Sequence, residues 1–210
     1  AIFEWQFSNA WPDNNAIQFQ IGSRAVQSMG GDGCFMSGYD HAVPSAWAYS
    51  DKADGGIWED GDVRKEESIR YDFTWFGKVP DLNSIAWEDI GEDHDELLPH
   101  IKKYEDFRTD IHSGLGLNNE WYSGKNIPFL RLGNAILLYA ECLNELGKTG
   151  EAMEEVNKVR ERAWDFDLPA EMRWSGMSQD QFRTELMTER VRELFGERWR
   201  RFDLVRTGKF

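Results

Sequence analysis

A glycine-rich stretch between residues 32 and 58 carries the side chains best suited to binding a ligand. Sugars present flat C–H faces ringed by hydroxyl groups, so a carbohydrate site needs exposed Trp or Tyr rings with amides and carboxylates nearby. Long loops punctuated by glycine often carry such sites. Large aromatic side chains also dominate protein cores, so packing is the competing interpretation for each ring. The predicted ligand-binding residues are Tyr39, Asp40, His41, Trp47, Tyr49 and Trp58.

A run of acidic residues overlaps this stretch and resembles a calcium loop in composition. Its spacing does not match the pattern of helix–loop–helix calcium sites, because Gly61 falls late. Calcium is the one cofactor that these residues leave open, and no other is predicted. The histidines show no paired ligand spacing, and no nucleophile-elbow, phosphate-loop or Cys-x-x-Cys motif occurs, so zinc, nucleophilic hydrolysis and nucleotide binding lack support. The acidic run consists of Asp51, Asp54, Glu59, Asp60 and Asp62.

The composition indicates a folded, acidic protein. The chain has 210 residues, of which 40% are hydrophobic and 14% aromatic, so it can bury a substantial core in one or two domains. Its formal net charge is -14. Binding to phosphate backbones or anionic lipid needs a basic surface, so this charge argues against nucleic acid and anionic membranes as partners.

The sequence predicts neither a membrane-spanning helix nor a secretion signal. No apolar run is long enough to cross a bilayer, and the first residues, AIFEWQF, lack a basic region and a cleavage site. Because the chain also begins inside a predicted strand, we expect it to be a fragment of a longer protein.

The N-terminal part is predicted to combine loops with short strands. Hydrophobic residues alternate with polar ones at 3–7 and again at 17–21, which predicts two strands paired as a hairpin. Glycine and proline punctuate residues 28–62, so we expect long ordered loops there with one short helix near 45–49. Alternation returns at 68–75 and predicts another strand.

From residue 128 the hydrophobic period becomes helical and predicts a first helix that ends at Gly147. A second helix is predicted from Thr149, and a third from Ser178, its capping residue, to about Arg201. The first two resemble a single tetratricopeptide unit, which cannot bury its face alone, so we expect the third helix to cover it. The predicted shared core consists of Phe129, Leu132, Ile136, Leu143, Val156, Val159, Leu194 and Phe195.

Two segments of this helical region carry a family signature. The first is IPFLRLGNAILLYAECLNELG at 127–147, followed by NKVRERA at 157–163. The second is ERVRELFGERWRRFDLVRTGKF at 189–210, and a DVR triplet at 62–64 matches a further motif. In this order they resemble the SusD/RagB family of surface glycan-binding lipoproteins of Bacteroidota. Asn134 departs from the pattern, which usually has Glu there.

The resemblance implies a mainly α, SusD-like fold. A tetratricopeptide-type helical pair and a third helix would be accompanied by long loops and a few short β-strands. Residues 1–126 are then expected to form a loop-rich segment with short strands and residues 127–210 a helical segment. Together they would make one C-terminal region of a longer chain.

The resemblance also implies a function. The protein would bind oligosaccharide or polysaccharide without catalysis and deliver it to a SusC-like TonB-dependent transporter. Its location would be the surface of the outer membrane. Membrane association would come only through an N-terminal lipid anchor absent from this chain, because Cys34 follows MGGDG rather than a signal peptide.

Two other function classes stay open. A glycoside hydrolase could draw an acid and a base from the many carboxylates, but each acidic pair is equally explained as solvated charge. A helical scaffold that binds only protein is the other alternative. The ionic residues of the signature are expected to tie helices and loops together rather than to bind ligand. They are Arg160, Arg162, Glu189, Arg190, Glu193 and Arg201.

Overall fold

The computed structural model divides the chain into two compact units, and each is treated by itself. The helical unit comprises Ala1–Glu4, Ala46–Glu67 and Pro128–Phe210, and the mixed unit comprises the described residues within Trp5–Ser45 and Ser68–Ile127. The helices thus pack with residues 46–67, which the sequence placed in the loop-rich segment. The structure describes residues 1–8, 12–22, 26–29, 35–36, 41–70, 72–75, 85–86, 99–105 and 123–210.

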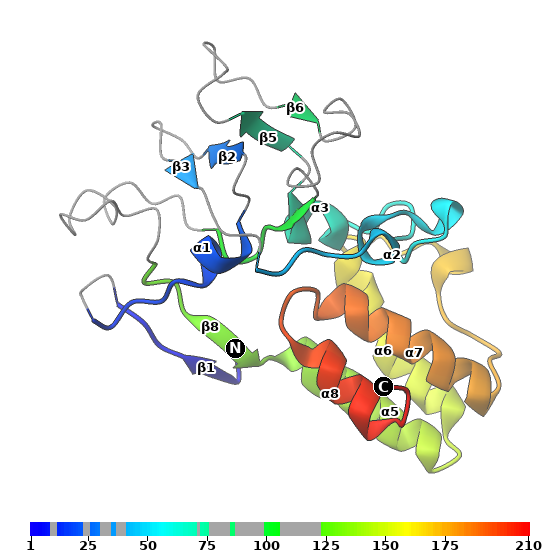
Figure 1. Cartoon of the computed structure of the whole chain (residues 1–210). Coiled ribbons are helices and arrows are strands. Elements are labelled where there is room, and N and C mark those ends of the chain that lie inside the picture. Colours follow the sequence, from blue (N-terminus) through cyan, green and yellow to red (C-terminus); the bar gives the residue numbers. More distant parts are fainter. Residues whose placement is uncertain are drawn as a thin grey trace. The chain divides into compact units, whose positions relative to one another are not determined.

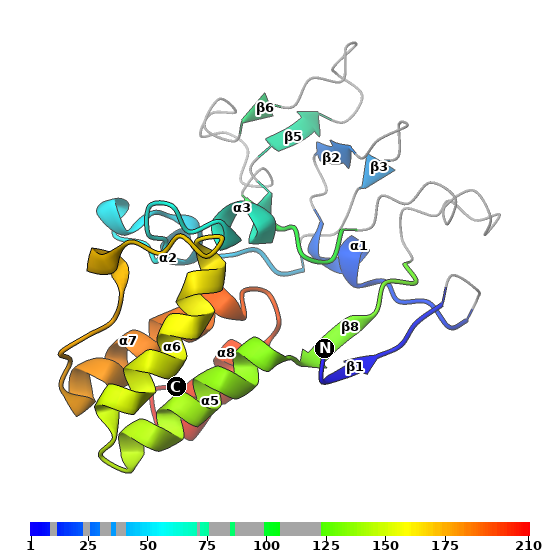
Figure 2. The ribbon, with the colours of Figure 1, turned by 180° about the vertical axis from the view of Figure 1, so that it is seen from behind.

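The helical unit is built on α5 (Leu132–Glu145), α6 (Thr149–Ala163) and α7 (Gln179–Glu193), with α8 (Trp199–Arg206) packed on α7. Figures 1 and 2 show α5 and α6 as an antiparallel pair with α7 against both. This confirms the mainly helical fold class with a few short strands. The core that these helices share is formed by Leu137, Ala140, Leu143, Ala152, Met153, Val156, Val159, Trp174, Phe182 and Leu186.

The predicted helix ends are largely confirmed. Gly147 has a φ of +76°, and its N–H donates to Asn144 O at 2.9 Å while that of Lys148 donates to Leu143 O at 2.9 Å. This pair of bonds closes α5 with a left-handed residue that favours glycine. Ser178 begins α7 with a complete capping box.

The third predicted helix is interrupted rather than continuous to Arg201. Gly196 and Arg198 have φ values of +73° and +65°, which an α-helix cannot contain. The chain therefore turns after Glu193 and starts the separate helix α8 at Trp199.

The prediction of an N-terminal hairpin is wrong. Strand β1 (Phe3–Trp5) pairs instead with β8 (Ile127–Leu130), so the first helix starts at Leu132 rather than near residue 128. Residues Ile17–Ile21 form helix α1. Their alternating pattern also places Ile17 and Ile21 four positions apart, and the helix buries both.

Two residues that were predicted to lie in the helical core are at the surface. Phe129 is 41% exposed and Leu132 is 65% exposed. Phe129 belongs to the strand, where its ring stacks edge-on against Phe3 with 5.9 Å between centroids. Leu143, Val156, Val159, Leu194 and Phe195 are buried as predicted, and Ile136 is partly buried.

The mixed unit contains a four-stranded sheet with the order β3-β2-β5-β6, in which all neighbours are antiparallel. A second pair joins β4 (Ile69–Arg70) to β7 (His100–Ile101). The four sheet strands are β2 (Val26–Met29), β3 (Phe35–Met36), β5 (Asp72–Trp75) and β6 (Ile85–Ala86). No helix among the described residues has the length and apolar content needed to cross a membrane.

Candidate functional site

The segment that enters the helical unit at residue 46 folds into a tight, internally bonded loop. It begins with α2 (Ala46–Tyr49), which confirms the predicted short helix, and continues through the 3-10 turn η2 (Lys52–Asp54). The N–H of Lys52 donates to Trp58 O at 2.7 Å and closes the turn. A Cβ on Gly56 would lie 2.0 Å from Ser50 O, so the backbone can pass there only as glycine.

Trp58 lies beneath this loop, not on it. Its side chain is fully buried, its Nε1 donates to Ala48 O at 2.8 Å, and its ring lies 5.8 Å from that of Phe195. The expectation that Trp58 offers an exposed face to a sugar is therefore wrong. Trp58 is instead a core residue, which was the competing interpretation. Its indole packs inside the helical unit and is hydrogen-bonded to α2.

Trp47 is the exposed ring of α2. It is 40% exposed, and the guanidinium carbon of Arg200 lies 5.5 Å from its ring centroid. Tyr49 follows on the same helix and is half-buried. The structure thus brings two predicted ligand-binding aromatics onto one short helix, and stacks on one of them an arginine that is distant in sequence and carries no local signal of this contact.

The remaining predicted residues lie elsewhere. His41 is exposed in the mixed unit, where its backbone N–H donates to Gln20 O at 2.8 Å. Tyr39 and Asp40 fall outside the described residues.

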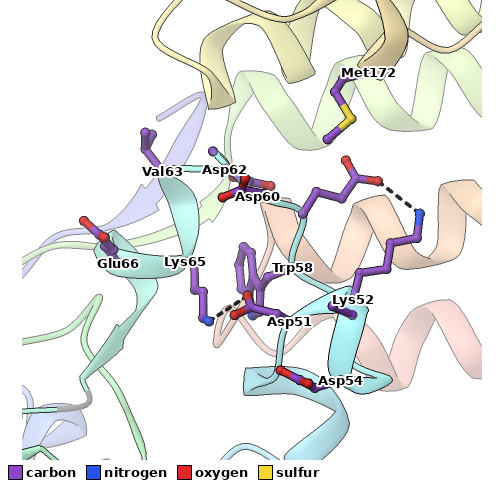
Figure 3. A pocket seen from close by; sticks show the side chains of 13 residues that line it. Asp51, Lys52, Asp54, Trp58, Asp60, Asp62, Val63, Lys65, Glu66 and Met172 are labelled. Atoms are coloured by element: carbon purple, nitrogen blue, oxygen red, sulfur yellow. Dashed lines mark hydrogen bonds and ion pairs between the residues drawn. The ribbon is translucent and has the colours of Figure 1, made fainter.

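A hollow of about 780 Å³ opens beside the loop (Figure 3). Two ion pairs cross it, Lys65 Nζ to Asp51 Oδ1 at 2.7 Å and Lys52 Nζ to Glu59 Oε1 at 3.3 Å. Acidic residues outnumber basic ones along its wall, so the hollow suits a polar ligand better than an apolar one.

Behind the hollow, Arg64 connects the loop to α7. Its guanidinium makes two bonds to Asp62, of 2.9 and 2.7 Å, and Nη1 also donates to Glu189 at 2.8 Å and Glu193 at 3.1 Å. All four side chains are nearly or fully inaccessible to solvent. Bidentate pairing of this kind suits the planar fork of arginine.

Arg160 and Arg192 complete a cluster of linked charged side chains, which we call the arginine cluster. Its members are Glu59, Asp62, Arg64, Arg160, Glu189, Arg192 and Glu193. Arg160 donates to Glu59 at 2.7 Å and to Glu189 at 3.1 Å. Arg192 donates to Glu189 at 2.8 Å and, through Nε, to the carbonyl oxygen of Ile57 at 2.6 Å. Two buried arginines from helices α6 and α7 therefore hold the loop by its side chains and by its backbone.

The cluster keeps its carboxylates ionised. Burial alone would raise the pKa of Glu189, but the charges of Arg64, Arg192 and Arg160 outweigh burial and hold the pKa far below its usual range. The pKa of Glu59 is lowered against burial in the same way by Arg192 and Arg160. These carboxylates cannot donate protons near neutral pH.

Comparison with known proteins decides the family. The model of the SusD family matches residues 47–210, which include the loop, the arginine cluster and helices α5, α6, α7 and α8. The chain belongs to the SusD family.

Two curated SusD relatives are similar to this chain in sequence over part of its length. SusD-like protein P2 of Formosa agariphila is 30% identical over 175 residues, covering 82% of this chain and 32% of that protein. The starch-binding protein SusD of Bacteroides thetaiotaomicron is 33% identical over 110 residues, or 52% of this chain and 17% of that protein. The chain thus spans about a third or less of the length of these curated relatives.

A solved structure has the same fold. Surface glycan-binding protein A from Bacteroides uniformis superposes with a TM-score of 0.66 at 20% identity, covering 99% of this chain and 37% of that one. The corresponding protein from Bacteroides fluxus gives a TM-score of 0.64 at 22% identity, covering 100% of this chain and 40% of that one. At these identities the likeness describes the fold alone.

The SusD signature residues are structural, as predicted from their charges. Arg160, Glu189 and Glu193 belong to the buried cluster, and Arg162 donates to Glu193. Arg190 donates to Asp203 at 2.8 Å and to Asn134 at 3.0 Å, so the asparagine that departs from the family pattern still accepts from an arginine. The exception is Arg201, which is exposed and lies over the ring of Phe210 at 5.7 Å.

The acidic run does not assemble as a calcium loop would. Asp51, Glu59 and Asp62 are each paired with lysine or arginine. Within the described parts of the chain, no three His, Cys, Asp or Glu side chains are grouped so that they could hold a metal ion.

Proposed function

We propose that this chain is part of a non-catalytic, surface-exposed protein of the outer membrane that binds oligosaccharide or polysaccharide. The match of residues 47–210 to the SusD family carries the proposal. The names of the relatives support it, since one is a starch-binding protein and two solved structures are surface glycan-binding proteins. The bound glycan would be handed to a SusC-like TonB-dependent transporter, and a lipid anchor outside this chain would hold the protein at the membrane.

Within this chain the proposed sugar-stacking residues are Trp47 and Tyr49. Both rings sit on α2, which the buried Trp58 and the arginine cluster hold in place. A ring that is already ordered loses little conformational entropy when a sugar stacks on it. Tyr39, Asp40 and His41 are kept as proposed neighbours in ligand binding.

The carboxylates favour binding over hydrolysis. A glycosidase needs one carboxylic acid whose pKa is raised so that it can protonate the leaving group. Glu59, which lines the hollow, and the buried Glu189 and Glu193 have lowered pKa values instead. A protein-only scaffold is less favoured, because the named relatives bind starch or glycan.

A panel of neutral and acidic oligosaccharides, followed by product analysis, tests this proposal. We expect retention of at least one sugar and no cleavage product. Trp47→Ala should weaken that binding about tenfold, as loss of a stacking contact predicts. Tyr139→Ala is the matched control, because Tyr139 is an aromatic residue that is 53% exposed on α5 rather than on α2. Release of shorter sugars would identify a hydrolase, and retention of no sugar would reject the proposal.

A further inference from the structure

We propose that Trp47 and Arg200 form a subsite for a sugar ring that carries a carboxylate. The inference rests on the proposed function and deepens it by naming the class of glycan. Uronic and sialic acids share this chemistry, which is a pyranose ring with a carboxylate at its edge.

The geometry places a flat ring beside a cation. The Arg200 guanidinium carbon lies 5.5 Å from the Trp47 ring centroid, a distance typical of cation–π stacking. Trp47 as a residue is 40% exposed, so part of its side chain remains available to a ligand. A sugar stacked on that part would have its edge groups within reach of the guanidinium.

Arg200 has hydrogen-bonding capacity to spare. A guanidinium carries five N–H donors. One of them, on Nη1, reaches Met187 O at 3.3 Å. Among the residues that the structure describes, no carboxylate lies within ion-pair distance of Arg200, and the nearby Asp203 is bound by Arg190 and Arg206.

This situation contrasts with that of nine other arginines of the helical unit, each of which is paired with a carboxylate. The contrast matters because a partly buried cation without a counter-ion is costly, and an incoming carboxylate relieves that cost. Burial lowers the pKa of Arg200, which is the signature of a guanidinium desolvated without full compensation. The arginines with carboxylate partners are Arg64, Arg131, Arg160, Arg162, Arg173, Arg183, Arg190, Arg192 and Arg206.

The overall charge of the chain narrows the kinds of acidic glycan that we expect to bind. A net charge of -14 repels densely charged polyanions at long range. A single guanidinium next to a ring can still attract one carboxylate at short range, through the bidentate geometry that arginine and carboxylate share. We therefore expect glycans with isolated acidic sugars to bind better than highly sulfated polymers.

Calorimetric titration with matched ligands tests the subsite. The ligands are a uronic-acid oligosaccharide, the same oligosaccharide with its carboxyl groups reduced to alcohols, and a sulfated form of that reduced oligosaccharide. We expect the native protein to bind the uronate about tenfold more tightly than the reduced form, as one charge-assisted bidentate contact predicts. A sialylated oligosaccharide and its carboxyl-reduced form distinguish the source of the carboxylate.

Two variants of neighbouring arginines locate the effect. Arg200→Gln should remove the preference and leave affinity for the reduced sugar unchanged. Arg201→Gln removes the same charge from an exposed neighbour and should keep the preference. Arg200→Lys keeps the charge without the fork and should retain only part of it. Melting temperatures of the three variants show that each remains folded.

The outcomes separate the subsite from the proposed function. Equal affinity for the uronate and the reduced sugar, or a preference that survives Arg200→Gln, would overturn the subsite while glycan binding stands. A stronger preference for the sulfated ligand would overturn its ligand class. Failure of the native protein to bind any glycan would reject the proposed function together with the subsite.

Discussion

Arg192 of helix α7 donates a 2.6 Å hydrogen bond through Nε to the backbone carbonyl of Ile57. Both residues are buried, with exposures of 1%. A side chain in the helical core thus fixes the backbone of the loop that carries Trp47. The same guanidinium neutralises Glu189 at 2.8 Å, so one residue serves both the charge balance and the loop.

Removing this guanidinium should therefore be costly. Arg192→Met leaves the buried carbonyl of Ile57 without this donor and removes one of the three arginines that bind Glu189. We expect the free energy of unfolding to fall by about 3 to 5 kcal/mol. Denaturant melts measure the change. Arg183→Met removes an arginine from the exposed pair with Glu145 and should change little. Equal effects of the two substitutions would contradict the role of the buried cluster.

The ionisation of Glu189 should make the free energy of unfolding depend on pH. Its pKa is lowered in the folded protein, so its contribution is fully present above the unfolded value of about 4.3 and is lost as the pH falls through the folded value. Native melts should therefore weaken steeply below about pH 4. Glu189→Gln should be less stable at neutral pH and should show a shallower decline on acidification. Glu151→Gln, at an exposed position on α6, should leave the native profile unchanged.

The shared helical core gives a third prediction. Leu143 is 6% exposed and belongs to the core cluster, so Leu143→Ala should lower the free energy of unfolding by about 2 to 5 kcal/mol. Leu146, only three positions later, is 75% exposed. Leu146→Ala should change stability by less than about 0.5 kcal/mol. A reversal of this order in denaturant melts would mean that the helix faces the core differently.

Gly56 gives a fourth prediction. Its missing Cβ would lie 2.0 Å from the backbone oxygen of Ser50, so Gly56→Ala must displace the loop and should lower both the melting temperature and glycan affinity. Gly150→Ala meets no atom within 4 Å on α6 and should stabilise the helix slightly. Unchanged binding by Gly56→Ala would show that the loop does not carry the site.

Local chemistry made much of the helical unit predictable. The capping box at Ser178 and the left-handed Gly147 depend on neighbouring residues, so the sequence contains the whole signal. The helix break after Glu193 was missed, because an isolated glycine such as Gly196 is tolerated inside a helix and Arg198 carries no signal of its left-handed conformation.

Long-range contacts account for the remaining errors. Phe129 lies in a strand because β1, which is near the N-terminus and distant in sequence, pairs with β8. Trp58 is buried because Phe195 packs against it, although its glycine-rich surroundings indicate a surface loop. The partner of each residue is distant in sequence, so periodicity and turn signals could not reveal it.

The buried cluster also determines how the loop opens. Surface loops usually exchange their amide hydrogens through local fluctuations that leave the core intact. Here the carbonyl of Ile57 and the carboxylate of Glu59 are bonded to arginines of α6 and α7, so the loop cannot detach without breaking contacts inside the helical core. The amides of residues 56–58, which donate within the loop, should then exchange only when the whole unit unfolds. The ring of Trp47 would accordingly meet its ligand from a surface as rigid as the protein interior.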